Sequence, residues 1–133
     1  MLFRSAKGGK AFGFFDGNRS SLLTLKDISV MDKLFPEKSE ALRRLDVSVL
    51  HTLVLEELLG IDKENMANQI NLTYTRSFDE AIEKGAKANC CFILNPTRVS
   101  EIADVAAAGE KMPQKSTYFY PKLTTGLVMN KIK

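Results

Sequence analysis

Apolar residues form short runs separated by glycine, proline and polar turns, a pattern typical of alternating strands and helices. The first run, 10–15, is followed by Asp16 and Gly17, and residues 20–25 then alternate roughly between polar and apolar. Because Asp-Gly readily adopts the positive φ angles of a tight reversal, the sequence predicts a β-hairpin over this stretch.

Helical spacing is strongest over residues 45–60, which follow a polar connector, 26–44, expected to hold one helical turn. Four apolar residues recur there at the spacing of one helix face: Leu50, Leu53, Val54 and Leu58. Gly60 suits the left-handed stop of a helix, and a second, shorter helix is expected to begin at Asp62.

Further strands are expected in the second half of the chain. Residues 69–75 alternate with period two, which is typical of a strand. The continuous apolar run 89–94 predicts a strand covered on both faces, at the centre of the sheet. Segments 117–120 and 126–129 offer one or two final strands.

Capping motifs place two more helices between these strands. The S-x-x-E motif that begins at Ser77 predicts a helix over 78–84 that ends at Gly85. Another helix is expected from Thr97, as its cap, to Gly109.

Two successive strand-then-helix units favour an α+β fold with an α/β-like core. We expect a mixed, partly parallel sheet of about 4–6 strands, with about 3–4 helices and an N-terminal β-hairpin. Residues 1–133 read as a single domain, in which 1–44 are hairpin plus connector and 45–133 form the main helix and sheet body.

Composition excludes several classes of protein. The 133 residues are 44% hydrophobic and 26% charged, which excludes disorder, collagen-like repeats and disulfide-framework scaffolds. No apolar run approaches the roughly 18 residues that span a bilayer, and no signal-peptide pattern occurs, so we expect a cytoplasmic protein without a membrane partner. Cys90 and Cys91 are neighbours on opposite strand faces and are expected to stay reduced.

Charge is unevenly distributed along the chain. Residues 111–133 contain five lysines and no acidic residue, whereas 46–110 contain five basic and eleven acidic residues. The basic tail can attract an anion, but no recognisable nucleic-acid-binding pattern occurs, so nucleic acid is not an expected partner. His51 is the one histidine and no phosphate-binding glycine motif is present, so we expect neither a metal nor a cofactor.

The segment 111–122 concentrates lysines, hydroxyls and phenols between prolines. Lysine ammonium groups and hydroxyls can hold a phosphate or carboxylate, and tyrosine rings can stack on a planar ligand. The candidate ligand-binding residues are Lys111, Lys115, Ser116, Thr117, Tyr118, Tyr120 and Lys122. The alternative is a strand with both tyrosines on one face and solvated lysines.

Two motifs resemble a known family. L-D-V-S-V-L-H at 45–51 with L-L-G-I at 58–61, and M-P-Q-K-S-T-Y-F-Y-P-K-L at 112–123, resemble the C-terminal part of an uncharacterised prokaryotic family, domain of unknown function 1015. The resemblance implies a longer parent protein. Its N-terminal half, absent here, carries a D-G-H-H-R-Y-E-like motif similar to ParB and sulfiredoxin-like proteins, a group that includes free-serine kinases.

Three functions follow as hypotheses. The first is a non-catalytic domain that binds a small anionic, phosphorylated metabolite or the N-terminal half of its own parent. The second, implied by the resemblance, is part of a phosphoryl-transfer enzyme of serine metabolism. The third is a protein-interaction module whose hairpin offers an edge strand to another copy, giving a homo-oligomer.

Overall fold

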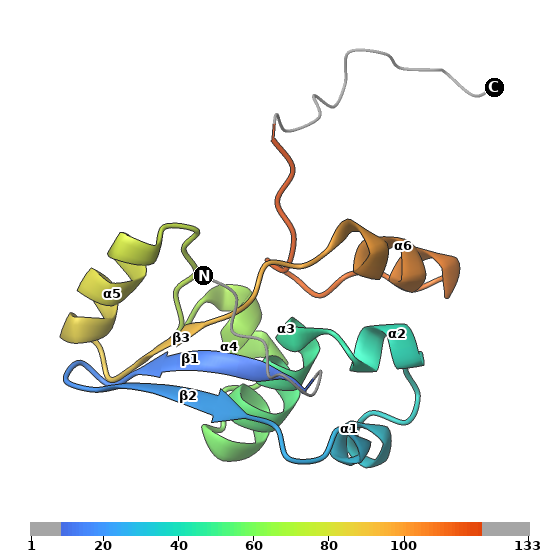
Figure 1. The fold of residues 1–133 in the computed structure, drawn as a ribbon, viewed down its shortest axis with the longest axis horizontal. Helices are drawn as coiled ribbons and strands as arrows, with labels where there is room; N and C mark the ends of the chain where they lie inside the picture. The colour runs from blue at the N-terminus through green and yellow to red at the C-terminus, as the bar shows by residue number, and fades with distance from the viewer. Residues whose placement is uncertain (1–8, 121–133) are drawn as a thin grey trace.

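The computed structural model describes residues 9–120, which form a small sheet with helices packed around it (Figure 1). The elements are β1 (Ala11–Phe15), β2 (Ser20–Thr24), α1 (Ser29–Leu34), α2 (Glu40–Arg43), α3 (Asp46–Val49), the π-helix η1 (Leu50–Leu58), α4 (Lys63–Asn68), α5 (Phe78–Lys87), β3 (Cys91–Ile93) and α6 (Val99–Ala107). Figure 1 shows α5 beside one end of the sheet and α1, α2 and α6 toward the other. The general α+β class is therefore confirmed.

The sheet itself differs from the one expected. Within the described residues it has three strands in the order β2-β1-β3, and both pairings are antiparallel. The prediction of a partly parallel sheet with about 4–6 strands is therefore wrong. It assumed that consecutive strand-then-helix units give neighbouring parallel strands. Instead β3 returns to the free edge of β1, far away in the sequence, and runs against it.

The predicted strand over 69–75 is absent because its backbone reverses. Gln69 and Asn71 have positive φ angles of 54° and 59°, so the chain cannot remain extended there. Gln69 is also the left-handed residue that ends α4. The predicted strand at 117–120 joins no described sheet, and the one at 126–129 lies outside the described residues.

The hairpin is confirmed, and its turn explains its register. The Asp16 carboxylate accepts hydrogen bonds from the backbone N–H groups of Asn18 and Arg19, at 2.8 and 2.7 Å. Gly17 supplies the positive φ angle of 92°. The turn joins β1 and β2 in an antiparallel pair that runs from Ala11↔Thr24 to Phe15↔Ser20.

Strand β3 was expected at the centre of the sheet but lies at its edge, where it is only half-buried. It pairs with β1 near Phe14, whose ring packs against Phe92 with centroids 5.2 Å apart. The central strand is β1, with Ala11 and Phe12 buried. The apolar run 89–94 gave no information on which partners would cover it.

Helix α5 does not end at Gly85 as predicted but continues to Lys87. Gly85 is buried, and a Cβ built there would lie 2.6 Å from the Cβ of Cys91 and 3.3 Å from the ring of Phe15. The glycine therefore allows α5 to approach β1 and β3 closely. The Ser77 cap is confirmed, since its side chain accepts from the Glu80 N–H at 3.3 Å.

The expected helix over 45–60 begins as α3 and widens into η1 after Val49. In the last turn of η1, the Leu59 N–H donates a hydrogen bond of 2.9 Å to the carbonyl of Val54, five residues earlier. A π-helix has more residues per turn than an α-helix, so the buried face drifts along it. Leu55 is consequently buried, whereas Leu58, predicted on the same face as Leu50, is 77% exposed.

Two apolar clusters hold the elements together. One joins Phe12, Met31, Val49 and Leu50; the other joins Leu42, Leu45 and Val105, with Met112 packed against it. Met31 and Leu42 come from the stretch expected to be a polar connector with one turn, which instead forms α1 and α2.

A partly buried hydrogen bond links the start of α2 to the segment after α6. The Ser39 hydroxyl donates to the Glu110 carboxylate at 2.5 Å and accepts from the Leu42 N–H at 3.2 Å. Lys38 lies 3.8 Å from the same carboxylate. Glu110 thus secures the point where the chain leaves α6.

Candidate functional site

Residues 113–120, here called the aromatic arm, begin with a turn and continue as an extended strand-like segment. The Ser116 N–H and hydroxyl both donate to the Pro113 carbonyl, at 3.4 and 2.6 Å. Lys115 takes a left-handed φ of 58° within this turn. The turn redirects the chain, and Figure 1 shows the segment leaving the body beside α6.

The base of the arm is attached to the body at two points. The Thr97 hydroxyl donates to the Ser116 carbonyl at 3.1 Å. Just before the arm, Met112 packs against the cluster that contains Leu42 and Val105. Thr97, expected as a helix cap, therefore anchors the arm, and α6 begins instead after Arg98, whose N–H donates to Glu101 at 2.8 Å.

Beyond the turn, three consecutive aromatic side chains are exposed. The exposed fractions are 55% for Tyr118, 60% for Phe119 and 87% for Tyr120. The Arg76 guanidinium lies 3.7 Å from the centroid of the Tyr118 ring, a cation–π contact.

The predicted site residues that the structure describes lie on one stretch of the chain and differ in exposure. Lys111, Lys115, Tyr118 and Tyr120 are exposed, and Ser116 and Thr117 are half-buried. The Ser116 hydroxyl proton is already donated within the turn, so it is not free to bind an anion. Lys122 lies outside the described residues.

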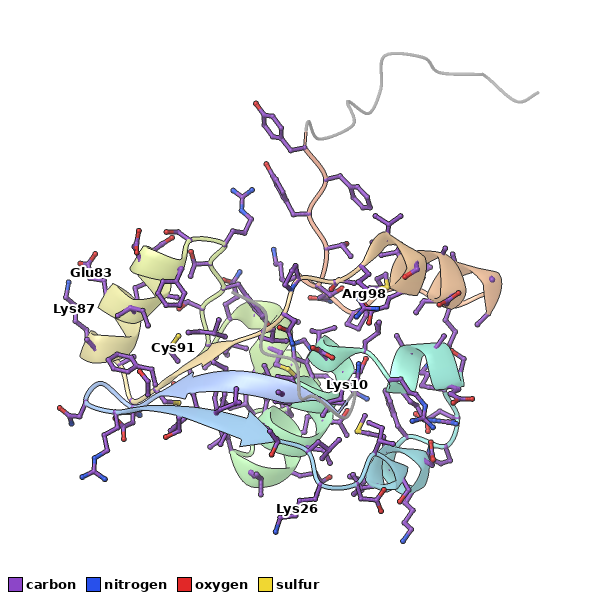
Figure 2. The ribbon with its side chains drawn as sticks, viewed as in Figure 1. Lys10, Lys26, Glu83, Lys87, Cys91 and Arg98 are labelled. Carbon is purple, nitrogen blue, oxygen red and sulfur yellow. The ribbon has the colours of Figure 1, made fainter. Side chains whose placement is uncertain are left out.

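Several cationic side chains lie in the arm or near it in the sequence or structure. Across residues 9–120, no carboxylate lies within ion-pair distance of Lys111, Lys115 or Arg76. Figure 2 places Arg98 at the start of α6, close to where the arm emerges. Sequence reasoning missed Arg76, because nothing in its spacing connects the loop before α5 with residue 118.

An open hollow of about 400 Å³ is lined by Glu56, Gly60, Asp62, Lys63 and Glu64. Three of these residues are acidic and one is basic. Its charge therefore opposes an anionic ligand, which makes it a poor candidate for the metabolite expected from the sequence.

Burial shifts the pKa values of the histidine and of both cysteines. Burial lowers the pKa of His51, whose ring meets that of Tyr74 edge-on with centroids 6.5 Å apart. Burial also raises the pKa of the Cys90 and Cys91 thiols, which keeps both protonated and weakly nucleophilic. In the part of the chain that the structure describes, no group of three His, Cys, Asp or Glu residues could hold a metal ion. No helix among these residues is long and apolar enough to cross a membrane.

No protein-family model, curated protein or solved structure matches the chain. The resemblance to the family of unknown function therefore stays a prediction.

Proposed function

We propose that this chain is a non-catalytic binding domain that docks onto another polypeptide through the aromatic arm. The observation that carries the proposal is the exposure of Tyr118, Phe119 and Tyr120 on one extended segment. Water-exposed aromatic residues that follow one another directly are typical of protein interaction sites, where tyrosine and phenylalanine are enriched.

The anchoring of the arm supports this proposal. The Thr97–Ser116 hydrogen bond fixes the start of the segment, and Arg76 restrains the Tyr118 ring. A partner would therefore meet a partly ordered ligand and lose less conformational entropy on binding.

The backbone of the arm is also available for pairing. In the described part of the chain, no backbone N–H or C=O group of residues 117–120 forms a hydrogen bond with another backbone group. An extended peptide of this kind can add a strand to the edge of a partner's sheet, with alternate side chains entering pockets.

The partner we propose is the N-terminal half of proteins in the family that the chain resembles. This half, expressed separately from a full-length member, would be titrated with the chain by calorimetry. We expect saturable binding that falls at least tenfold on Phe119→Ala, the central residue of the exposed aromatic group.

The matched control is Leu58→Ala, which removes a comparably exposed apolar side chain from the end of η1. It should bind like the unsubstituted chain. Equal weakening by both substitutions, or binding unaffected by Phe119→Ala, would contradict docking through the arm.

An anionic ligand is a second candidate, supported by the cations without carboxylate partners at the base of the arm. Lys115 and Arg76 would carry this binding, since the Ser116 hydroxyl is already engaged. Calorimetry with phosphoserine, ATP and pyrophosphate should then give heat that Lys115→Ala reduces. Absence of heat with all three would eliminate this candidate, while the phosphoryl-transfer alternative rests on the resemblance alone.

A further inference from the structure

Strand β2 forms an open edge of the sheet. All five of its residues are exposed, and within residues 9–120 its only strand partner is β1. The Leu25 N–H donates to the Lys10 carbonyl at 2.9 Å, and the Asp16 N–H donates to the Arg19 carbonyl at 3.2 Å. Because inward and outward positions alternate in an antiparallel pair, Ser20, Leu22 and Thr24 direct their N–H and C=O groups outward.

This edge lacks the features that usually prevent strands from pairing with one another. Proteins protect open edges with charged residues, prolines or bulges. The sequence of β2 is Ser-Ser-Leu-Leu-Thr, and its register with β1 is continuous over five pairs. Leu22, at the middle of the strand, is 55% exposed.

We propose that β2 pairs antiparallel with β2 of a second copy of this chain, centred on Leu22. In this register Leu22 faces its own counterpart, and Ser20 faces Thr24 of the second copy. The outward N–H and C=O groups of all three residues then find partners. The arrangement is two-fold symmetric and closes as a dimer with one continuous sheet.

The charges that flank β2 are complementary in the same register. Antiparallel pairing places the start of β2 in one copy beside its end in the second, so Arg19 of one copy comes near Asp27 of the second. The pair occurs twice by symmetry, and Arg19 faces Leu25 of the second copy, so no like charge stands directly opposite it.

The dimer edge is separate from the aromatic arm. Figure 1 shows β2 on one side of the body and the arm leaving from the other. Dimerisation therefore does not depend on the proposed docking, and each can fail without the other.

The test is sedimentation equilibrium over a wide range of protein concentration. We expect a monomer–dimer equilibrium for the unsubstituted chain and a dissociation constant raised at least tenfold by Leu22→Lys. Because the Leu22 side chain is already exposed, the lysine should not prevent folding, which circular dichroism would verify. Leu58→Lys, another exposed leucine, is the control and should still dimerise.

A charge exchange tests the register itself. Arg19→Asp should weaken the dimer through repulsion from Asp27 of the second copy, and the double variant Arg19→Asp with Asp27→Arg should restore it. A monomer at every concentration would overturn the proposal. A dimer insensitive to Leu22→Lys, or a double variant no better than Arg19→Asp, would also overturn it.

Discussion

Two sets of aromatic residues in this chain have similar chemistry and opposite placements. Phe12 is buried in the core and Phe14 packs against Phe92, whereas Tyr118, Phe119 and Tyr120 are exposed on the arm. Burial of an apolar side chain is the main source of folding free energy. The first set therefore stabilises the fold, and the second is left available for a partner.

The largest difference should appear on truncation of one aromatic residue from each set. Phe12→Ala should lower the free energy of unfolding by about 3–5 kcal/mol, because it leaves a cavity beside Met31 and Val49. Phe119→Ala should change it by less than about 0.5 kcal/mol. Urea denaturation followed by circular dichroism measures both, and similar losses in the two variants would remove the distinction.

Gly85 tests how tightly α5 packs on the sheet that holds the buried aromatic residues. Helix propensity alone predicts that Gly85→Ala stabilises the protein by about 1 kcal/mol. The contact of the new Cβ with Cys91 predicts instead a loss of about 1–3 kcal/mol from overpacking. The sign of the change in urea denaturation decides between them.

The control for Gly85→Ala is Ala86→Gly at the next, exposed helix position. It should follow helix propensity and destabilise by about 1 kcal/mol. A stabilising effect of Gly85→Ala would contradict the close approach of α5 to β3.

A smaller effect is expected where the chain leaves the body for the arm. Ser39→Ala removes the side chain that caps α2 and donates to Glu110. We expect a loss of about 1 kcal/mol in the free energy of unfolding, a typical value for a helix N-cap. Thermal denaturation of this variant beside Ser21→Ala, an exposed β2 serine, would measure it, and equal stabilities would contradict the role of the cap.

The same contact gives the smallest predicted effect, a dependence on pH. The Ser39 hydroxyl holds the pKa of the Glu110 carboxyl below its usual value. The contribution of Glu110 to stability is therefore complete above its ordinary pKa and is lost as the pH falls through the lowered one. Glu110→Gln should flatten this acid limb in urea midpoints measured between about pH 6 and pH 3, and an acid limb as steep as that of the unsubstituted chain would contradict this role of Glu110.

Local signals in the sequence identified several elements correctly. Asp16 with Gly17 marks the hairpin turn, Asp62 caps α4 by accepting from the Asn65 N–H at 2.8 Å, and Ser77 caps α5. Each of these features depends on residues within four positions of one another. Short-range hydrogen bonding is sufficient to specify them.

Features that depend on distant residues were not predictable in the same way. The antiparallel pairing of Phe14 with Phe92 and the burial of Gly85 against Cys91 arise only when separate segments meet. The cation–π contact between Arg76 and Tyr118 is of the same kind. The basic and aromatic segment was visible in the sequence, but its extension away from the body was not.

A single fluorescent residue in the arm would show whether the arm is exposed and whether it binds a partner. The chain contains no tryptophan, so Phe119→Trp would introduce one reporter at the centre of the exposed aromatic group. We predict the red-shifted emission of a water-exposed indole, freely quenched by acrylamide. Adding the N-terminal half of a family member should then shift the emission to the blue and protect the indole from quenching.

A reporter at Leu58→Trp should show the exposed spectrum with and without that partner. We predict that only the arm reporter responds. Blue-shifted, protected emission from Phe119→Trp in the chain alone would show that the arm is buried in its own fold, and this result would contradict docking through the arm.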